Sequence, residues 1–305
     1  MTSLSLFSSL PERVNIVEVG PRDGLQNESL SISAQDKVDF VNQLSQVGCK
    51  HIEAASFVSP KWVPQMASSD EVMRKIQRQE GIVYSALTPN VKGFEAAIAA
   101  NADQVAIFAA ASESFSQKNI NCSIAQSIQR FEPILESAIA KGIKVRAYVS
   151  CVLGCPYDGE IAADDVVEVA KTLIDMGCYE VSLGDTIGVG TPLKTAKLIE
   201  ACLQYIPASK LAGHFHDTYG QALANVLTAL TMGINTFDSS VAGLGGCPYA
   251  KGASGNLASE DLVYMLHKMN IKTGIDLNRL IRVGHNISGL LQRKNASKVG
   301  LALNT

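Results

Sequence analysis

The chain has 305 residues, of which 47% are hydrophobic and 18% are charged, and its formal net charge is −3 at pH 7. This charge gives no electrostatic basis for binding nucleic acid or an anionic membrane, and no apolar run reaches the ~20 residues of a spanning helix. The seven cysteines lack paired spacing and the first residues carry no signal or transit pattern, so we expect reduced thiols and a cytoplasmic location.

Short apolar runs alternate with helical patterns along most of the chain. The apolar runs predict strands at 14–19, 50–54, 82–87, 104–108, 143–149, 179–183, 210–214 and 234–238. Helical patterns lie between them, clearest at 33–47, 92–101, 123–141, 164–176, 192–205 and 219–232, and several end at a glycine. Eight strand-helix units in sequence predict an α/β fold with a parallel sheet, the (β/α)8 TIM barrel.

The helix starts support this division of the chain. Ser33 is a plausible N-cap, and Thr191 followed by Pro192 is a typical N-cap and first-turn pair. We expect a single catalytic domain over residues 1–305, in which about 270–305 form extra C-terminal helices. An open doubly wound sheet is the alternative, but it usually has fewer strands and a phosphate-binding glycine motif after its first strand, which this sequence lacks.

In a TIM barrel the site lies at the C-terminal ends of the strands, and there the sequence places several polar residues. His214 and His216 are two residues apart at the end of strand seven, so both imidazoles face the same side, with Cα atoms roughly 6.5–7 Å apart. Asp23 follows strand one and Asn256 follows strand eight, and these strands neighbour strand seven in a closed barrel. The four residues are therefore candidate ligands of one metal ion.

This ligand set contains no sulfur, which favours Mg²⁺ or Mn²⁺ over a structural zinc site, with Zn²⁺, Co²⁺ and Fe²⁺ as alternatives. A simpler interpretation of the two histidines is a hydrogen-bonded pair at a strand end. Asn256, or else Ser259, also suits the N-cap of the helical pattern at 257–269.

Charged residues near strands one and two are candidates for catalysis. Arg22 follows a rigid Gly-Pro pair, and a guanidinium held over the barrel mouth would stabilise negative charge on oxygen. Glu18 and Glu53 lie within apolar strands, where acids are rarely buried without a partner. We expect one of them to pair with Arg22 or to bond a metal-binding histidine. The alternative for Glu18 is a purely structural salt bridge.

A glycine-rich stretch, 239–256, follows strand eight and contains Cys247. Its glycines permit positive φ and close approach to a ligand, as in a mobile lid that delivers a thiol. The alternative is an ordinary strand-to-helix connection with a small buried cysteine. The long loop at 56–66 holds the only tryptophan. This loop either lines a substrate entrance or covers the end of strand two as plain packing.

Together these motifs resemble the 3-hydroxy-3-methylglutaryl-CoA lyase family over nearly the whole chain. The matching stretches are 18–28, 52–66, 148–159, 177–192, 214–225 and 238–264, and 240–249 resembles the signature around the active-site cysteine of the family. The Arg-Asp and His-x-His pairs are shared by a wider group of barrel enzymes and are less specific. The resemblance implies that the four candidate ligands bind a divalent metal, that Arg22 contacts substrate and that Cys247 is catalytic.

The implied reaction is carbon–carbon cleavage of (S)-3-hydroxy-3-methylglutaryl-CoA to acetyl-CoA and acetoacetate, as in leucine degradation or ketone-body metabolism. A base must take the C3 hydroxyl proton, and Asp185, Glu53 or a ligand histidine are candidates. Gln26 and Thr186, which follow strands one and six, are expected to bind substrate. Cys247 is the candidate acid that protonates the enolate left by cleavage.

The expected partner is therefore a small acyl-CoA substrate, and we expect a homodimer. A condensing synthase of the same scaffold, a metal-dependent hydrolase and a non-catalytic barrel are alternatives. The synthases usually carry a substantial region after the barrel, a hydrolase does not need a thiol on a glycine loop, and a scaffold does not need metal ligands at several strand ends.

Overall fold

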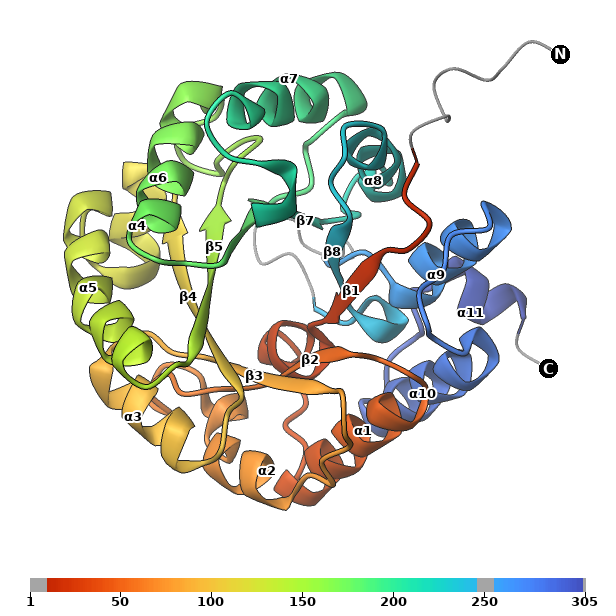
Figure 1. The fold of residues 1–305 in the computed structure, drawn as a ribbon. Helices are drawn as coiled ribbons and strands as arrows, with labels where there is room; N and C mark the ends of the chain where they lie inside the picture. The colour runs from red at the N-terminus through yellow and green to blue at the C-terminus, as the bar shows by residue number, and fades with distance from the viewer. Residues whose placement is uncertain (1–9, 246–254, 304–305) are drawn as a thin grey trace, which may run out of the picture.

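The computed structural model describes residues 10–245 and 255–303, in which eight parallel strands close into one barrel (Figure 1). Each strand pairs with the next along the chain, and β1 pairs with β8 to close the ring. The strands are β1 (Asn15–Glu18), β2 (His51–Ser56), β3 (Val83–Leu87), β4 (Gln104–Ala110), β5 (Lys144–Ser150), β6 (Glu180–Asp185), β7 (Leu211–Phe215) and β8 (Thr236–Ser239). The predicted TIM barrel is confirmed.

Helices surround the barrel in chain order (Figure 1). They are α1 (Ala34–Gln46), α2 (Ser69–Lys75), α3 (Val91–Ala99), α4 (Glu113–Ile120), α5 (Ile124–Ala140), α6 (Ala163–Asp175), α7 (Pro192–Leu203), α8 (Ala222–Thr231), α9 (Ser259–Lys268), α10 (Leu277–Leu290) and α11 (Lys298–Ala302). Helix α4 was not predicted, because it is short and has a weak apolar stripe. Among the described residues, no helix has the length and apolar character needed to cross a membrane.

The predicted helix starts are made by side-chain caps. The Ser33 hydroxyl accepts a hydrogen bond from the Asp36 amide at 3.1 Å, and the Asp36 carboxylate bonds back to the Ser33 amide, which completes a capping box. Thr191 caps α7 ahead of Pro192. The start of α9 differs from the prediction, because its N-cap is Ala258 and neither Asn256 nor Ser259 caps it.

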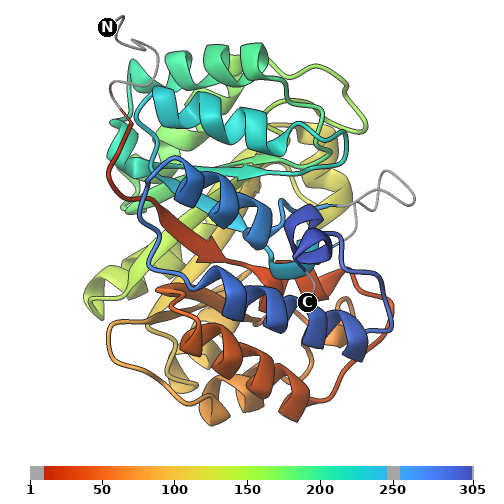
Figure 2. The same ribbon diagram turned by 90° about the vertical axis from the view of Figure 1, so that its right-hand side faces the viewer.

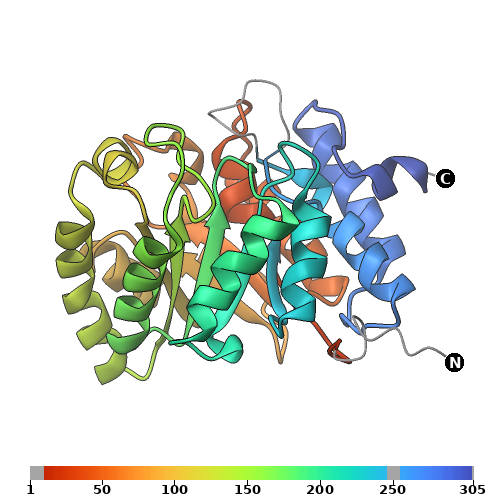
Figure 3. The ribbon, with the colours of Figure 1, turned by 90° about the horizontal axis from the view of Figure 1, so that it is seen from above.

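The apolar core lies mainly between the strands and the surrounding helices, while the barrel interior is unusually polar. Outward-facing residues such as Val105, Ile107 and Leu211 are fully buried against the helices. Inside the barrel, charged side chains are equally buried: Glu53, Arg146, Asp238 and Glu180. Figure 3 shows the strands running in a common direction toward one rim, which is where the sequence places the candidate site.

The last helices cover the outside of β1 and β8. Helices α9 and α10 lie between α8 and α1 around the barrel, and α11 packs against α9 (Figures 1 and 2). Residues after 270 thus form α10 and α11, in agreement with the expected extra C-terminal helices.

Two buried carboxylates from this region hold the turn that follows β8. Glu18 accepts hydrogen bonds from the Val241 amide at 2.9 Å and from the Ser259 hydroxyl at 2.5 Å. Glu260 accepts from the Ala242 amide through both oxygens, at 3.0 and 2.9 Å. Ala242 has a left-handed φ of 58°, which is unfavourable for a residue with a side chain, so these two acceptors stabilise a strained turn.

We expect Glu260→Gln to remove a pH-dependent loss of stability. Burial raises the pKa of Glu260 to about 8, so the folded protein keeps a proton that the unfolded chain releases. The contribution of Glu260 to the free energy of unfolding is fully present below the unfolded pKa near 4.5. This contribution is lost as the pH rises to the folded pKa of about 8. The neutral amide of Gln avoids this loss. The Tm of the variant should therefore gain on wild type between pH 5 and pH 8, at roughly 2–4 °C per kcal/mol.

Thermal unfolding of both proteins at several pH values checks this expectation. Glu132→Gln, an exposed substitution within α5, is the control for simple removal of a carboxylate. A difference in Tm between Glu260→Gln and wild type that stays constant with pH would contradict the expectation.

Candidate metal centre and active site

Arg22 and Asp23 lie on a single turn of π-helix, Gly20–Gly24, directly after β1. The amides of Arg22 and Gly24 both bond the Val19 carbonyl at 3.1 Å, which widens the turn. Gly24 permits close packing, because a Cβ there would lie 2.6 Å from the Ser240 hydroxyl. The turn therefore brings two consecutive charged side chains to the barrel mouth, and isolated π-helical turns are frequent at functional sites.

Arg22 is fixed by two carboxylates and an aromatic ring. Its Nε donates to Glu53 Oε2 at 2.6 Å and its Nη1 lies 2.5 Å from Asp23 Oδ1. The guanidinium carbon is 5.3 Å from the centre of the Tyr148 ring. The expected pairing of Glu53 with Arg22 is thus present, while Glu18 bonds amides and a hydroxyl instead.

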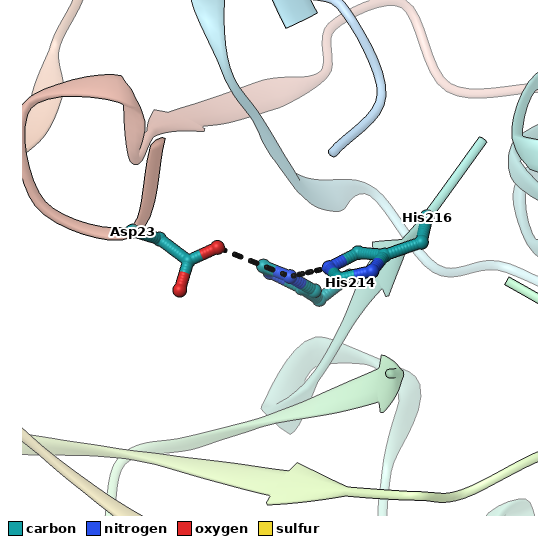
Figure 4. Close-up of side chains that lie close together, drawn as sticks. All are labelled: Asp23, His214 and His216. Atoms are coloured by element: carbon teal, nitrogen blue, oxygen red, sulfur yellow. Dashed lines mark hydrogen bonds and ion pairs between the residues drawn. The ribbon is translucent and has the colours of Figure 1, made fainter. Parts of the chain in front are cut away.

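Asp23, His214 and His216 converge on one point of the mouth (Figure 4). The two histidine Nε2 atoms are 3.2 Å apart, and His214 Nε2 is 4.0 Å from Asp23 Oδ2. One candidate ligand atom from each of the three residues lies within 4.8 Å of the other two. The structure therefore brings together three of the four predicted ligands at a separation that suits a shared cation.

The protonation states also suit a cation. Burial opposes the charged form of Asp23, but Arg22, the two histidines and the Asn256 amide together outweigh it and lower the pKa of this carboxyl to about 2. Burial and the neighbouring His214 lower the pKa of His216 to about 4, so this imidazole is neutral near pH 7. A carboxylate and a neutral imidazole facing the same point are the forms in which these groups ligate metals.

Asn256 lies beside the three converging residues. Its amide nitrogen is 2.8 Å from Asp23 Oδ2 and 3.2 Å from the Leu244 carbonyl. The chain at this point runs along the end of β7, with an isolated bridge between Asn256 and His216. The side-chain oxygen of Asn256 therefore lies close to the cluster as well. A rotation of the amide group exchanges the positions of its oxygen and nitrogen.

Asp185 ends β6 and Thr186 follows it, but the two side chains differ in what they face. Asp185 is fully buried and accepts hydrogen bonds from the amides of Val189 at 3.1 Å and Gly190 at 2.9 Å. It closes the loop after β6 and does not line the cavity described below. Burial raises its pKa to about 6. Thr186 lines the cavity, and its hydroxyl accepts from the Cys151 amide at 2.8 Å.

A cavity of about 820 Å³ opens over the converging residues. Its floor includes Arg22, Asp23, His214 and His216, and Gln26 lines it with a buried side-chain oxygen that has no hydrogen-bond partner among the described residues. Its outer parts carry Trp62, Lys118 and Arg130. Trp62 is 86% exposed, which favours the substrate-entrance interpretation of its loop over plain packing.

The remaining predicted site residue, Cys247, lies outside the described residues. Three further groups that were not predicted from the sequence surround the cluster, namely Tyr148, Arg146 and Asp238. Tyr148 lies edge-on to His214 at 6.0 Å, and Asp238 bonds His214 directly at 3.1 Å. Arg146 and Tyr148 are two apart on β5, and this spacing was a visible signal that the two side chains share a face, whereas nothing local to β8 marked Asp238.

The protein is an eight-stranded parallel barrel with a large cavity at one end. A carboxylate, two imidazoles and a buried arginine meet at this cavity. This is the architecture of metal-dependent barrel enzymes. The comparisons with known proteins agree with this class. The HMGL-like family model matches residues 13–287. The chain belongs to this family, that of the hydroxymethylglutaryl-CoA lyases.

Two relatives illustrate the similarity in sequence. The chain is 58% identical over 295 residues to the 3-hydroxy-3-isohexenylglutaryl-CoA/hydroxy-methylglutaryl-CoA lyase of Pseudomonas aeruginosa, covering 97% of this chain and 98% of that protein. It is 59% identical over 300 residues to the mitochondrial hydroxymethylglutaryl-CoA lyase of Bos taurus, covering 98% and 92%.

Two solved structures show the similarity in fold. The hydroxymethylglutaryl-CoA lyase of Pseudomonas aeruginosa matches with a TM-score of 0.96 and 57% identity, covering 97% of this chain and 99% of that one. An HMG-CoA lyase from Acinetobacter baumannii, solved in complex with coenzyme A and 3-methylmalate, matches with a TM-score of 0.91 and 37% identity, covering 99% and 97%.

Proposed function

We propose that this protein cleaves (S)-3-hydroxy-3-methylglutaryl-CoA to acetyl-CoA and acetoacetate in a metal-dependent reaction. The observation that carries the proposal is the convergence of Asp23, His214 and His216 beside Arg22, on the floor of a cavity of about 820 Å³. Relatives that are 58% and 59% identical over nearly the whole chain bear the name of this lyase. The chain would act as one catalytic domain.

Asp23, His214, His216 and Asn256 would hold the metal, which we propose to be Mg²⁺ or Mn²⁺. When bound there, such an ion polarises the hydroxyl and carboxylate oxygens of the substrate and orients both. Oxygen and imidazole donors without sulfur support this choice of ion. Burial of His214 and the low pKa of Asp23 keep the ligand atoms in place and in the required charge state.

Arg22 would stabilise the negative charge that develops on the thioester oxygen as the C2–C3 bond breaks. Its Nε and Nη1 are occupied by Glu53 and Asp23, and the guanidinium lines the cavity, so its remaining edge is available to substrate. Glu53 is fully buried behind Arg22 and acts by holding it. Because no reorganisation of the guanidinium is needed during the reaction, its stabilising effect is large.

Proton transfer would begin at the C3 hydroxyl and end at the enolate carbon. Among Asp185, Glu53 and the ligand histidines, only the histidines line the cavity, which favours a histidine as the first proton acceptor. Asp185 would position the loop that carries Thr186. Gln26 and Thr186 would bind the substrate, and Cys247 would supply the final proton.

The coenzyme A portion would leave the cavity past a basic rim. Lys118 lies in the last turn of α4 and Arg130 lies on α5, and both exposed side chains line the outer cavity together with Trp62. Cations at this position suit the phosphates of coenzyme A. A relative of the same fold was solved with coenzyme A bound.

We expect Lys118→Ala to raise KM for the acyl-CoA about tenfold with little change in kcat, since a charge-assisted hydrogen bond contributes about 1.5 kcal/mol or more. Steady-state kinetics at several ionic strengths provide the measurement, because salt should weaken the wild-type contact and leave the variant nearly unaffected. Lys141→Ala is the matched control, because Lys141 is the C-cap residue of α5 and does not line the cavity. Equal KM values for the two variants would remove Lys118 from the substrate site.

A coupled assay for acetyl-CoA and acetoacetate tests the proposed function. Protein stripped of metal should be inactive and should regain activity when Mg²⁺ or Mn²⁺ is added. Release of free coenzyme A without acetoacetate would indicate a hydrolase, and condensation of acetyl-CoA with a 2-oxo acid would indicate a synthase. No turnover with any of these substrates would indicate a non-catalytic barrel.

We further propose a cytoplasmic homodimer. The dimer rests on expectation from the family resemblance. The location rests on the cysteine content, and relatives of this family carry both mitochondrial and cytoplasmic names. Light scattering and cell fractionation test the two proposals separately.

A further inference from the structure

Asp238 lies on β8 with its side chain inside the barrel, directly beneath the converging residues. It is only 2% exposed, and its Oδ2 is 3.1 Å from Nδ1 of His214. The same oxygen accepts a hydrogen bond from the Ser182 hydroxyl at 2.7 Å. The other oxygen, Oδ1, lies 2.8 Å from Nη2 of Arg146. Both oxygens of this carboxylate therefore have assigned partners on three other strands.

Arg146 determines how the Asp238 carboxylate is oriented. Its Nε donates to Glu180 Oε1 at 2.7 Å, so the guanidinium is held between two acids from β6 and β8. The side chain is 3% exposed and its guanidinium carbon lies 5.1 Å from the centre of the Tyr148 ring. The ion pair with Arg146 on one oxygen, and the hydrogen bonds of Ser182 and His214 on the other, favour one orientation of Asp238, with Oδ1 toward Arg146 and Oδ2 toward His214.

An ionised carboxylate can only accept hydrogen bonds, so His214 must donate to Asp238 through Nδ1. A neutral imidazole carries one proton, and when it lies on Nδ1 the other nitrogen, Nε2, has a free lone pair. Nε2 of His214 is the atom that faces Asp23 and His216, at 4.0 and 3.2 Å. The bond to Asp238 thus exposes the lone pair toward the proposed metal.

We propose that Asp238, oriented by Arg146, is a positioning residue that fixes the Nδ1-protonated tautomer of His214 and so makes Nε2 a metal ligand. The inference rests on the proposed metal site. It extends that site from four ligands at the mouth to a buried support that includes β5 and β6. Outer partners of this kind typically change metal affinity by about 10–100-fold when they are lost.

The substitution Asp238→Asn keeps the size of the side chain but changes which of its atoms accept and donate hydrogen bonds. Arg146 needs an acceptor, so the amide oxygen of Asn should stay with Arg146 and the amide nitrogen should face His214. That nitrogen donates, so Nδ1 becomes an acceptor and the proton moves to Nε2, where it points at the cation. We expect Mn²⁺ to bind the metal-free variant about 10–100-fold more weakly than wild type, measured by calorimetry without substrate.

The matched control is Ser85→Ala. Ser85 is also a buried polar residue of the barrel interior that bonds a histidine, His51, at 2.9 Å, but His51 lines a separate cavity at the opposite ends of the strands. We expect this variant to bind Mn²⁺ within about threefold of wild type. If both substitutions weaken binding equally, damage to the barrel interior explains the loss and the proposal is overturned.

Nitrogen-15 NMR of the wild-type protein tests the tautomer directly, and so decides the question even if Asp238→Asn does not fold. In metal-free protein labelled on its histidines, at a pH where the His214 ring carries a single proton, that proton should lie on Nδ1 and not on Nε2. Protonation at Nε2, or unchanged Mn²⁺ affinity in Asp238→Asn, or no Mn²⁺ binding by wild type, would overturn the inference. An inactive protein with the expected tautomer and Mn²⁺ affinity would overturn only the proposed reaction.

Discussion

Arg22→Lys is expected to lower kcat by on the order of 10²–10³, with KM changed only a few-fold. Lysine keeps the charge but not the planar fork, so it cannot bond Glu53 and Asp23 while also presenting an edge to the developing oxyanion. Steady-state kinetics at saturating Mg²⁺ measure both constants, and the free energy of unfolding by urea shows whether Glu53 remains paired.

Arg130→Lys at the rim of the same cavity is the matched control, because this exposed side chain has no carboxylate partner to hold its geometry among the described residues. We expect its kcat to stay near wild type. A change confined to KM in Arg22→Lys would assign Arg22 to substrate binding alone and would contradict its proposed role in stabilising the enolate.

His216→Ala is expected to raise the Mn²⁺ concentration needed for half-saturation by more than 100-fold. Loss of an outer partner of a ligand alone lowers metal affinity about 10–100-fold, and His216 would be a direct ligand, so its loss should cost more. Calorimetry on metal-free protein gives the affinity, and an assay over a range of Mn²⁺ concentrations gives the dependence of kcat. The fold should persist, since the imidazole sits at the rim and not in the apolar core.

His285→Ala controls for loss of a half-buried histidine, because His285 lies on α10 and bonds only the Gly300 carbonyl among the described residues. It should bind Mn²⁺ like wild type. If His216→Ala also keeps the wild-type dependence on Mn²⁺, His216 is not a ligand and the hydrogen-bonded pair considered from the sequence becomes the better interpretation.

Most of the barrel could be predicted from the sequence because each of its units carries local signals. Ser33 and Thr191 start helices by capping them, and Gly48, Gly142 and Gly177 have positive φ after α1, α5 and α6. Helix α4 escaped prediction because it is short, and the start of α9 was wrong because Ser259 bonds Glu18 through a contact between distant parts of the chain.

The site divides in the same way between local and distant contacts. Spacing alone predicted that His214 and His216 share a face, and the closed barrel predicted that Asp23 is near them. Their role as ligands, like the role of Cys247, stays a prediction. The support from Asp238 and Arg146 could not be predicted, because it depends on register: Asp238 is level with His214 on the next strand, and Arg146 with Glu180.

The charged network inside the barrel has a consequence for protein design. Arg22 and Arg146 lie at 5.3 and 5.1 Å on the same Tyr148 ring, and each guanidinium is held by two carboxylates. The mouth and the middle of the barrel are therefore joined in one charged network, with members from the turn after β1 and from β2, β5, β6 and β8. Grafting only the three converging residues onto another TIM barrel should therefore give a site that binds metal weakly and orients its ligands poorly. The unit to transfer is the whole set of charged side chains around Tyr148.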